Sequence, residues 1–253
     1  MRLTRVCLAQ PLAAGATMLA DERATAHLTR VLRLSRDAPL RVFDGAGAEH
    51  AATLGTLRGA QVEIRVGEPV TARAESPLAI TLVQGVSRGE RMDYTIQKAT
   101  ELGVQRVVPV LAERSIVRLD AVQAVRKLEH WRGVALAACE QCGRARLPAI
   151  DAPRSLVEQL AAPAAPAVSA AAAGVALRLL LTPDGEQRLG ALPDGLAAVE
   201  LLVGPEGGLS DAEQQLARRA GFVGLKLGPR VLRTETAALA AIAALQALRG
   251  DLL

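Results

Sequence analysis

Aromatic residues are scarce in this chain: its 253 residues include one Trp, one Tyr and two Phe, only 2% of the sequence, although 50% of the residues are hydrophobic. The chain is long enough to bury a sizeable core, either as one large domain or as two small ones. With so few rings, Ala, Leu and Val must fill most of that core.

Cysteine is scarce too, with three residues in all. Cys139 and Cys142 form a CxxC pair, but no second pair or histidine cluster completes a zinc site, so we expect no metal. An odd number of cysteines without paired spacing is typical of reduced thiols in a cytosol. The sequence also lacks a signal peptide and a charge-free apolar span of membrane length. We therefore expect a soluble, cytoplasmic protein that does not enter a membrane.

Positive charge is in slight excess, with a formal net charge of +4 that arginine carries far more than lysine. The planar guanidinium group binds phosphates and base edges bidentately, which suits an RNA partner. A mere compositional bias towards arginine explains the same excess without any partner. Charge alone does not decide between the two interpretations.

The first 72 residues are typical of a small β domain. Residues 40–43 and 61–66 alternate between apolar and charged side chains, and residues 44–47 form a turn before a further strand at 49–54. Residues 24–33 have helical spacing, with Leu28, Val31 and Leu32 expected to face inward. The opposite face is either solvated or an RNA contact, and it carries three cationic or titratable residues: His27, Arg30 and Arg33.

A polar, proline-marked linker at residues 68–77 separates this region from the rest. We therefore expect a boundary within residues 68–78 and domains at 1–72 and 73–253. Beyond it, strands at 78–86 and 104–111 alternate with helices at 92–102 and 121–141. This rhythm predicts an α/β fold with a parallel sheet and helices on both faces. Residues 161–173 are low in complexity, and Pro163 and Pro166 favour a loose surface connection there.

Three strand ends near the C-terminus are followed by irregular loops. Residues 199–203 form a buried strand, and four Gly or Pro residues interrupt it at 204–208 before a helix capped by Ser210 and Glu213. A second strand at 223–227 is broken at 228–230 and leads to a helix at 234–249, and a third strand at 177–181 ends in Thr-Pro-Asp-Gly. Ligands of open α/β sheets bind at this edge, so the three loops are expected to line one pocket.

Two of these segments, LLVGPEGGLSDAE at 201–213 and LGPRVLRTETA at 227–237, resemble the signature pair of the SPOUT class of S-adenosylmethionine-dependent RNA methyltransferases. The closest resemblance within that class is to bacterial enzymes that methylate a uridine at N3 in 16S ribosomal RNA. Further matches are KATELG at 98–103, Arg114-Ser115 and EQCGR at 140–144, so the resemblance covers essentially the whole chain. It implies an N-terminal PUA-like β-barrel, a C-terminal trefoil knot and a homodimer. The implied partner is 16S ribosomal RNA or the small ribosomal subunit.

The resemblance also implies residue roles. The expected ligands of S-adenosyl-L-methionine are Leu181, Thr182, Pro183, Val203, Gly204, Pro205, Gly207, Gly208, Leu227, Gly228, Val231, Leu232 and Thr236. The expected RNA contacts are Arg5, His27, Arg30, Arg33, Arg114 and Arg144. We expect Gly207 to lie where a β-carbon would strike the cofactor or force a disallowed backbone conformation.

Methylation at uridine N3 requires that the imide proton leave and that the resulting anion be stabilised. Arg233 is the candidate for the positive charge, and Glu206, Glu235 and Glu140 are candidate bases or orienting groups. Glu235 has a purely structural explanation as well, because a carboxylate in a first helical turn is stabilised by the helix dipole. Two other functions stay open: a SPOUT methyltransferase of another RNA position, such as a ribose 2′-hydroxyl, and a catalytically silent RNA-binding factor.

Overall fold

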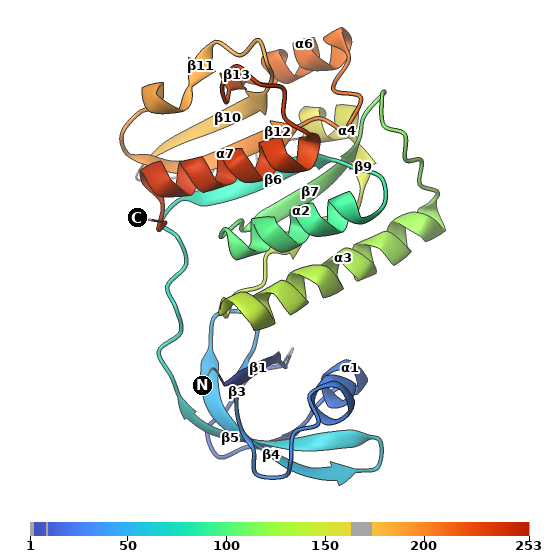
Figure 1. Cartoon of the computed structure of the whole chain (residues 1–253), viewed down its shortest axis with the longest axis vertical. Coiled ribbons are helices and arrows are strands. Elements are labelled where there is room, and N and C mark those ends of the chain that lie inside the picture. Colours follow the sequence, from blue (N-terminus) through green and yellow to red (C-terminus); the bar gives the residue numbers. More distant parts are fainter. Residues whose placement is uncertain (1–2, 9, 163–173, 253) are drawn as a thin grey trace. The chain divides into compact units, whose positions relative to one another are not determined.

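The computed structural model describes residues 3–8, 10–162 and 174–252. They form two compact units, one of Met1–Glu75 with Leu136–Leu147 and the other of Ser76–Ala135 with Pro148–Leu253 (Figure 1). Most of the alanine-rich segment that we expect to be a surface connection, residues 163–173, lies outside the described residues. Among the helices described, none is long and apolar enough to cross a membrane.

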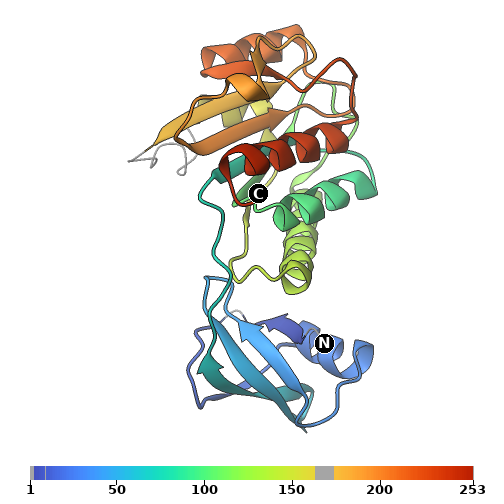
Figure 2. The same ribbon diagram turned by 60° about the vertical axis from the view of Figure 1, so that its left-hand side comes forward.

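The N-terminal unit contains a mixed five-stranded sheet in the order β1-β3-β4-β5-β2 (Figure 2). Its strands are β1 Thr4–Cys7, β2 Thr17–Leu19, β3 Pro39–Phe43, β4 Glu49–Arg58 and β5 Gln61–Pro69. Strand β1 pairs with β3 in parallel, and the other pairs are antiparallel. The predicted strands at 40–43, 49–54 and 61–66 are confirmed, because alternate residues such as Leu40, Val42, Val62 and Ile64 fill one buried cluster.

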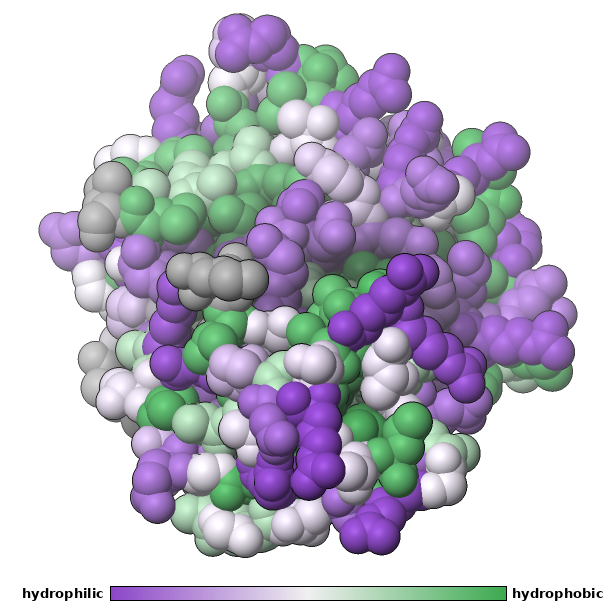
Figure 3. Space-filling view, turned by 60° about the horizontal axis from the view of Figure 1, so that its bottom comes forward, coloured by the Kyte–Doolittle hydropathy of each residue, from purple (hydrophilic) through white to green (hydrophobic). Residues whose placement is uncertain are grey.

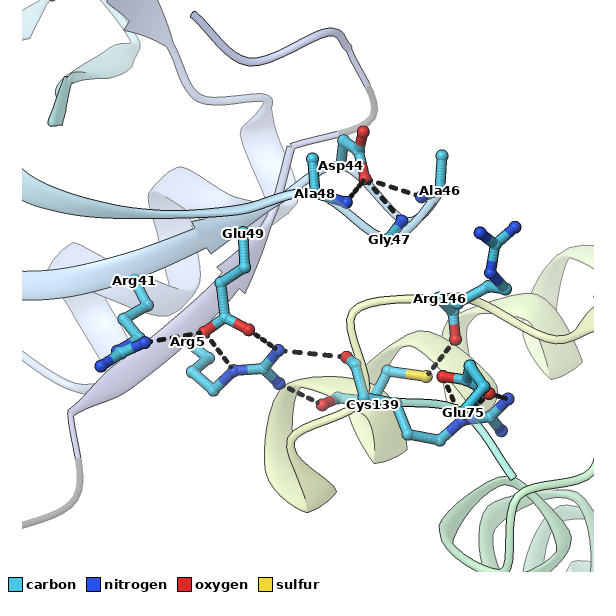
Figure 4. A network of polar contacts seen from close by, with 11 residues as sticks. Arg5, Arg41, Asp44, Ala46, Gly47, Ala48, Glu49, Glu75, Cys139 and Arg146 are labelled. Carbon is cyan, nitrogen blue, oxygen red and sulfur yellow. Dashed lines mark hydrogen bonds and ion pairs between the residues drawn. The ribbon is translucent and has the colours of Figure 1, made fainter. Parts of the chain in front are cut away.

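The turn predicted between β3 and β4 is also confirmed (Figure 4). One oxygen of Asp44 accepts hydrogen bonds from the backbone N–H groups of Ala46, Gly47 and Ala48, at 2.7, 3.0 and 3.0 Å. A short side-chain acceptor at the start of a turn replaces the missing backbone partners, which is why Asp is favoured there.

The helix predicted at residues 24–33 is instead a short α-helix, α1 Glu22–Ala26, followed by a π-helical turn, His27–Val31. The N–H of Leu32 reaches back five residues to the carbonyl oxygen of His27, at 2.9 Å. This wider turn changes the direction of the following side chains. Leu28 is buried as expected, but the expectation for Val31 and Leu32 is wrong, since they are 68% and 40% exposed.

The C-terminal unit holds an eight-stranded sheet in the order β11-β13-β10-β12-β6-β7-β8, with β9 paired to β7. All of its pairs are parallel. The strands are β6 Ala79–Gly85, β7 Arg106–Leu111, β8 Ala149–Ile150, β9 Arg154–Ser155, β10 Val175–Leu181, β11 Gln187–Arg188, β12 Leu196–Val203 and β13 Phe222–Lys226.

Helices cover both faces of this sheet, as predicted (Figure 1). They are α2 Glu90–Glu101, α3 Ala121–Cys142, α4 Leu156–Ala161, α6 Asp211–Arg219 and α7 Thr234–Arg249. Residues of α2, α7 and the first part of α3 pack with Leu201 in one cluster, while residues of α4 and α6 pack with Leu202 in another. Side chains alternate across a strand, so neighbouring apolar residues of a buried strand serve both cores.

One charged residue, Glu200, lies in the middle of the buried strand β12 and is fully enclosed. Its carboxylate accepts a hydrogen bond from Arg178 Nε at 2.8 Å and another from Gln159 Nε2 at 3.3 Å. A buried charge with such partners is tolerated, whereas removal of one partner costs about 3–5 kcal/mol.

The two sheets establish the α/β architecture, with a mixed N-terminal sheet and an all-parallel C-terminal sheet. The PUA-like barrel and the trefoil knot stay predictions.

Candidate cofactor and active site

The three predicted loops lie at one edge of the C-terminal sheet. Strands β13, β10 and β12 are adjacent and parallel, so their carboxyl ends at Lys226, Leu181 and Val203 point the same way. The segments that follow them surround a pocket of about 540 Å³. Pockets of several hundred Å³ at the carboxyl edge of a parallel sheet are typical of cofactor sites.

Most of the predicted site residues line this pocket. All the expected cofactor ligands do so except Gly207 and Thr236, and so do the three candidate catalytic residues, Arg233, Glu206 and Glu235. Thr234, next to Thr236 in the first turn of α7, lines it instead. The walls combine apolar side chains with bare backbone, which fits the adenine ring, the aliphatic chain and the polar edges of S-adenosylmethionine.

The environment of Gly207 differs from the expectation. A β-carbon at this position would lie 2.8 Å from the carbonyl oxygen of Arg114 and 2.9 Å from its Cβ. Gly207 also has no positive φ angle. Glycine is therefore required because the loop packs against the backbone of Arg114, and the close neighbour is protein rather than ligand.

A second close approach lies beneath the loop after β12. A β-carbon on Gly85, the last residue of β6, would lie 2.4 Å from the backbone nitrogen of Pro205 and 2.7 Å from the carbonyl carbon of Gly204. Beside it, buried Gln84 donates a hydrogen bond to Thr234 Oγ1 at 2.9 Å, and Thr234 donates to the carbonyl oxygen of Gly204 at 2.6 Å. The end of β6, the loop after β12 and the start of α7 are thereby joined below the pocket.

One oxygen of Glu206 is held by two neighbours. Its Oε1 accepts hydrogen bonds from the backbone N–H of Arg88 and from Arg91 Nη1, each at 3.0 Å. Burial by itself would raise the pKa of the Glu206 carboxyl, but these donors outweigh burial, and the pKa lies below its usual value. A carboxylate with a lowered pKa is a weak base, so Glu206 is poorly suited to remove a proton at neutral pH.

Glu235 has a different environment in the first turn of α7. Its Oε1 lies 4.0 Å from Arg91 Nε, and its side chain is only 14% exposed. Its Oε2 is buried and has no hydrogen-bond partner among the residues described. A buried oxygen without a hydrogen-bond donor destabilises the folded protein, unless a bound ligand donates a hydrogen bond to it. Glu235 lines the pocket, so its carboxylate lies next to the space for a bound substrate, although Oε2 itself is buried.

Arginines line the pocket too. Arg233 and Arg230 are exposed, and neither side chain has an ion-pair partner in the part of the chain that the structure describes. Arg114, also exposed, donates a long hydrogen bond of 3.4 Å to the carbonyl oxygen of Leu209. Exposed guanidinium groups at a cofactor pocket are suited to a polyanionic substrate such as RNA.

Two of the predicted RNA contacts, Arg5 and Arg144, are held in ion pairs within the N-terminal unit, and Figure 4 shows the surroundings of Arg5. Arg5 is 8% exposed, and its guanidinium group makes two hydrogen bonds to Glu49 at 3.0 and 3.1 Å. The same group donates to the carbonyl oxygen of Cys139 at 2.7 Å and lies over the ring of Phe43. Arg144 is bound to Glu75 through Nε and Nη2. Both arginines therefore stabilise the N-terminal unit internally and do not present a free charge.

The remaining candidates of the N-terminal unit are three predicted RNA contacts and one candidate base. Arg30 and Arg33 are exposed, and His27 is partly buried. Glu140, considered above as a base, does not line the pocket: it accepts hydrogen bonds from the backbone N–H of Cys7 and from Arg23 Nη2, both at 3.0 Å. Glu140 thus has a structural role in the N-terminal unit.

The cysteines offer no reactive thiol at the pocket. Burial, and then the nearby carboxylate of Glu140, raises the pKa of Cys7 to about 11. A hydrogen bond with Cys142, together with burial, raises the pKa of Cys139 as well. Within residues 3–8, 10–162 and 174–252, no group of three His, Cys, Asp or Glu is placed to hold a metal ion.

Sequence analysis missed Arg91, which lines the pocket from the first turn of α2. A signal for it exists, since Arg91 follows the predicted strand at 78–86 by only a few residues. In the sheet, β6 pairs directly with β12, so the start of α2 adjoins the loop after β12.

Known proteins with related sequences and structures agree with this geometry. The chain matches the RNA methyltransferase domain family over residues 74–246. It is 32% identical over 228 residues to the ribosomal RNA small subunit methyltransferase E of Buchnera aphidicola, with 90% of this chain and 89% of that protein covered.

Solved structures extend the similarity to proteins that hold the cofactor. One is a ribosomal RNA small subunit methyltransferase E from Neisseria gonorrhoeae bound to S-adenosyl methionine, 38% identical with a TM-score of 0.91. Another is a putative methyltransferase from Legionella pneumophila in complex with SAM, 35% identical with a TM-score of 0.92. In both cases 100% of each chain is covered. This chain belongs to the RNA methyltransferase domain family, and within it to the S-adenosylmethionine-dependent ribosomal RNA small subunit methyltransferases E.

Proposed function

We propose that this protein transfers a methyl group from S-adenosylmethionine to N3 of a uridine in 16S ribosomal RNA. The observation that carries the proposal is the meeting of three glycine- and proline-containing loops with Arg233 and Glu235 at one pocket. Among the described residues, the Arg233 guanidinium has no ion-pair partner and the buried Oε2 of Glu235 has no hydrogen-bond partner. A ribosomal substrate implies that the enzyme acts in the cytoplasm, on free RNA or on the small subunit.

Each loop has a part in binding the cofactor. Apolar side chains such as Leu181, Leu227 and Leu232 enclose the ring and aliphatic portions, and the backbone of the 204–208 loop is accessible because glycine leaves it bare. When bound, S-adenosylmethionine supplies an electrophilic methyl group on a cationic sulfur. The protein itself must position the acceptor and deal with its proton.

The acceptor nitrogen carries an imide proton that has to leave as the new N–C bond forms. Glu235 is the proposed proton acceptor, because its Oε2 has no hydrogen-bond partner in the part of the chain described, whereas Oε1 of Glu206 accepts two hydrogen bonds that lower the pKa of its carboxyl. As the N3–H bond breaks, negative charge spreads to O2 and O4 of the base, and Arg233 stabilises that charge electrostatically. The N3 electron pair would then form the bond to the methyl carbon as the bond between that carbon and the cofactor's sulfur breaks, with its electron pair returning to sulfur, and the proton would stay on Glu235.

A reaction of the purified protein with small-subunit ribosomal RNA and S-adenosylmethionine tests the proposed function. Nucleoside mass spectrometry of the digested product should detect 3-methyluridine as the new modified nucleoside. A methyl group found on a ribose 2′-hydroxyl, or no transfer while calorimetry shows cofactor binding, would contradict the assignment to N3.

RNA recognition is proposed for the N-terminal unit, in keeping with domains at 1–72 and 73–253. The π-helical turn and the residues after it expose Arg30 and Arg33 beside the apolar side chains of Val31 and Leu32. In Figure 3, long hydrophilic side chains likewise stand between smaller hydrophobic patches. Cations bind phosphates, and apolar groups contact unstacked bases, so such mixed surfaces suit single-stranded RNA.

Replacement of both Arg30 and Arg33 by alanine should weaken RNA binding and reduce its dependence on salt. If each arginine contacts one phosphate of a single strand, the slope of log K against log salt concentration should become shallower by about 1.4. Filter binding at several salt concentrations measures the slope, and calorimetry should find cofactor affinity unchanged. An unaltered slope would mean that this face is merely solvated.

The homodimer implied by the resemblance is likewise a proposal. Light scattering of the purified protein at micromolar concentration should give twice the chain mass of 26.4 kDa. A strictly monomeric species that still methylates RNA would show that one chain contains the complete active site.

A further inference from the structure

Arg91 connects two glutamates that belong to different parts of the pocket. From the first turn of α2, its Nη1 donates to Glu206 Oε1 at 3.0 Å, in the loop after β12. Its Nε lies 4.0 Å from Glu235 Oε1, in the first turn of α7. One guanidinium group therefore interacts with both acidic residues of the pocket, although it belongs to none of the three loops.

This arrangement fixes the two carboxylates differently. Glu206 is also bound by the backbone N–H of Arg88, so the loop after β12 is held against the connection between β6 and α2. Glu235 is attracted through Oε1 only, and at a distance longer than a hydrogen bond. Its Oε2 is left without a partner among the described residues. The charge of Arg91 thus orients Glu235 without occupying the oxygen that the substrate needs.

We propose that Arg91 is a positioning residue for methyl transfer, which holds Glu206 in place and orients the free oxygen of Glu235 towards the acceptor base. The proposal rests on the proposed function, because the orientation of Glu235 affects the reaction rate only if Glu235 removes the N3 proton. Arg91 differs in this from Arg233 and Arg230, whose side chains have no ion-pair partner in the described ranges and remain available to RNA.

The exposure of Arg91 separates this role from a contribution to folding. Its side chain is 44% exposed, and ion pairs at such sites contribute little to stability because water screens them. By contrast, a reacting group displaced by about 1 Å can slow a reaction about 100-fold. A positioning role therefore predicts a large kinetic effect with a small effect on the melting temperature.

The test compares Arg91→Gln with Arg132→Gln, a change of an exposed arginine on α3 that has no ion-pair partner in the part of the chain described. For Arg91→Gln, kcat should fall about 10- to 100-fold, while KM for RNA and the dissociation constant of S-adenosylmethionine change less than about threefold, which is under 0.7 kcal/mol. Arg91→Lys, which keeps the charge without the planar fork, should recover part of the rate. An increased KM with unchanged kcat would overturn the proposal and make Arg91 an RNA contact.

A double-mutant cycle tests the link to Glu206. If Arg91 acts through Glu206, the variant with both Arg91→Gln and Glu206→Gln should be about as slow as the slower single variant. Effects on kcat that multiply in full would show that the two residues act independently, and would overturn the proposal.

Hydrogen exchange separates this proposal from the proposed function. The Gly208 N–H donates to the carbonyl oxygen of Pro205 at 2.8 Å, so its exchange reports on the loop that Glu206 holds. It should exchange faster in Arg91→Gln than in Arg132→Gln, with no RNA present. Equal exchange would overturn the positioning role even in an active enzyme. Absence of 3-methyluridine from the wild-type reaction, with the exchange difference present, would overturn the function alone.

Discussion

Replacement of Arg233 by alanine is expected to lower the turnover of uridine methylation by about 10²–10³-fold, as loss of one group that stabilises a developing oxyanion does in other enzymes. Arg233 lies directly before α7, its side chain is exposed, and it lines the pocket. Because it is one cation among several at this site, RNA affinity should change little. Single-turnover measurements with saturating RNA isolate the chemical step.

Two further variants define the role of the charge. Arg233→Lys keeps the positive charge but loses the planar group, so it should recover part of the rate. Raising the pH should help Arg233→Ala more than wild type, because a larger fraction of the uridine is then already deprotonated. Arg132→Ala serves as the matched control. If Arg233→Ala methylates saturating RNA at the wild-type rate, Arg233 is a binding residue and the anion is stabilised elsewhere.

Gly85→Ala is expected to weaken the binding of S-adenosylmethionine strongly, although Gly85 does not line the pocket. The added carbon would lie 2.4 Å from the nitrogen of Pro205, an approach that backbone atoms relieve only by moving. Overpacking of this kind costs about 1–3 kcal/mol. If the cost falls on the 204–208 loop, cofactor binding should weaken about 5- to 150-fold.

The control for this change is Gly133→Ala on α3, where an added β-carbon would meet no heavy atom of the described residues within 4 Å. Titration calorimetry gives the cofactor affinity, and circular dichroism gives the melting temperature of each variant. A folded Gly85→Ala protein with unchanged affinity would show that the loop yields without loss of function. That result would mean that cofactor binding does not depend on the position of the 204–208 loop.

Strong local patterns made much of the fold predictable. The capping box of α6 is one example: Glu213 donates its N–H to Ser210 Oγ, and the N–H of Ser210 donates to Glu213 Oε2 at 2.9 Å. The strand at 199–203 is another, since apolar residues on both of its faces require helices on both sides of a parallel sheet. The pocket followed from these elements, because parallel neighbouring strands bring their carboxyl ends together.

Two of the errors concern contacts that residue spacing does not indicate. The arginine at position 5 was assigned to RNA, but it forms a buried ion pair with Glu49, 44 positions away, and nothing near Arg5 in the sequence indicates this partner. Likewise, the π-helical turn at His27–Val31 exposes Val31, although residue spacing alone predicts an α-helix. Distant packing decides the first case, and a local hydrogen bond from the Leu32 N–H to the carbonyl oxygen of His27 defines the second.

The candidate glutamates show the same limit at the site. Glu206 and Glu235 each lie within one of the two signature motifs, and nothing local to either distinguishes a base from a structural carboxylate. Their partners do: Glu206 accepts two hydrogen bonds, whereas one oxygen of Glu235 has none within the described ranges. Both environments depend on Arg91, which is more than one hundred residues earlier in the chain.

The most direct test of the account is the modified nucleosides of small-subunit ribosomal RNA from cells that lack this protein. Mass spectrometry should find one 3-methyluridine lost relative to the parent strain. The nucleoside should return when the wild-type protein is supplied, but not with a variant carrying both Arg233→Ala and Glu235→Gln. An unchanged level of 3-methyluridine in the deleted strain, or full restoration by the double variant, would contradict the account.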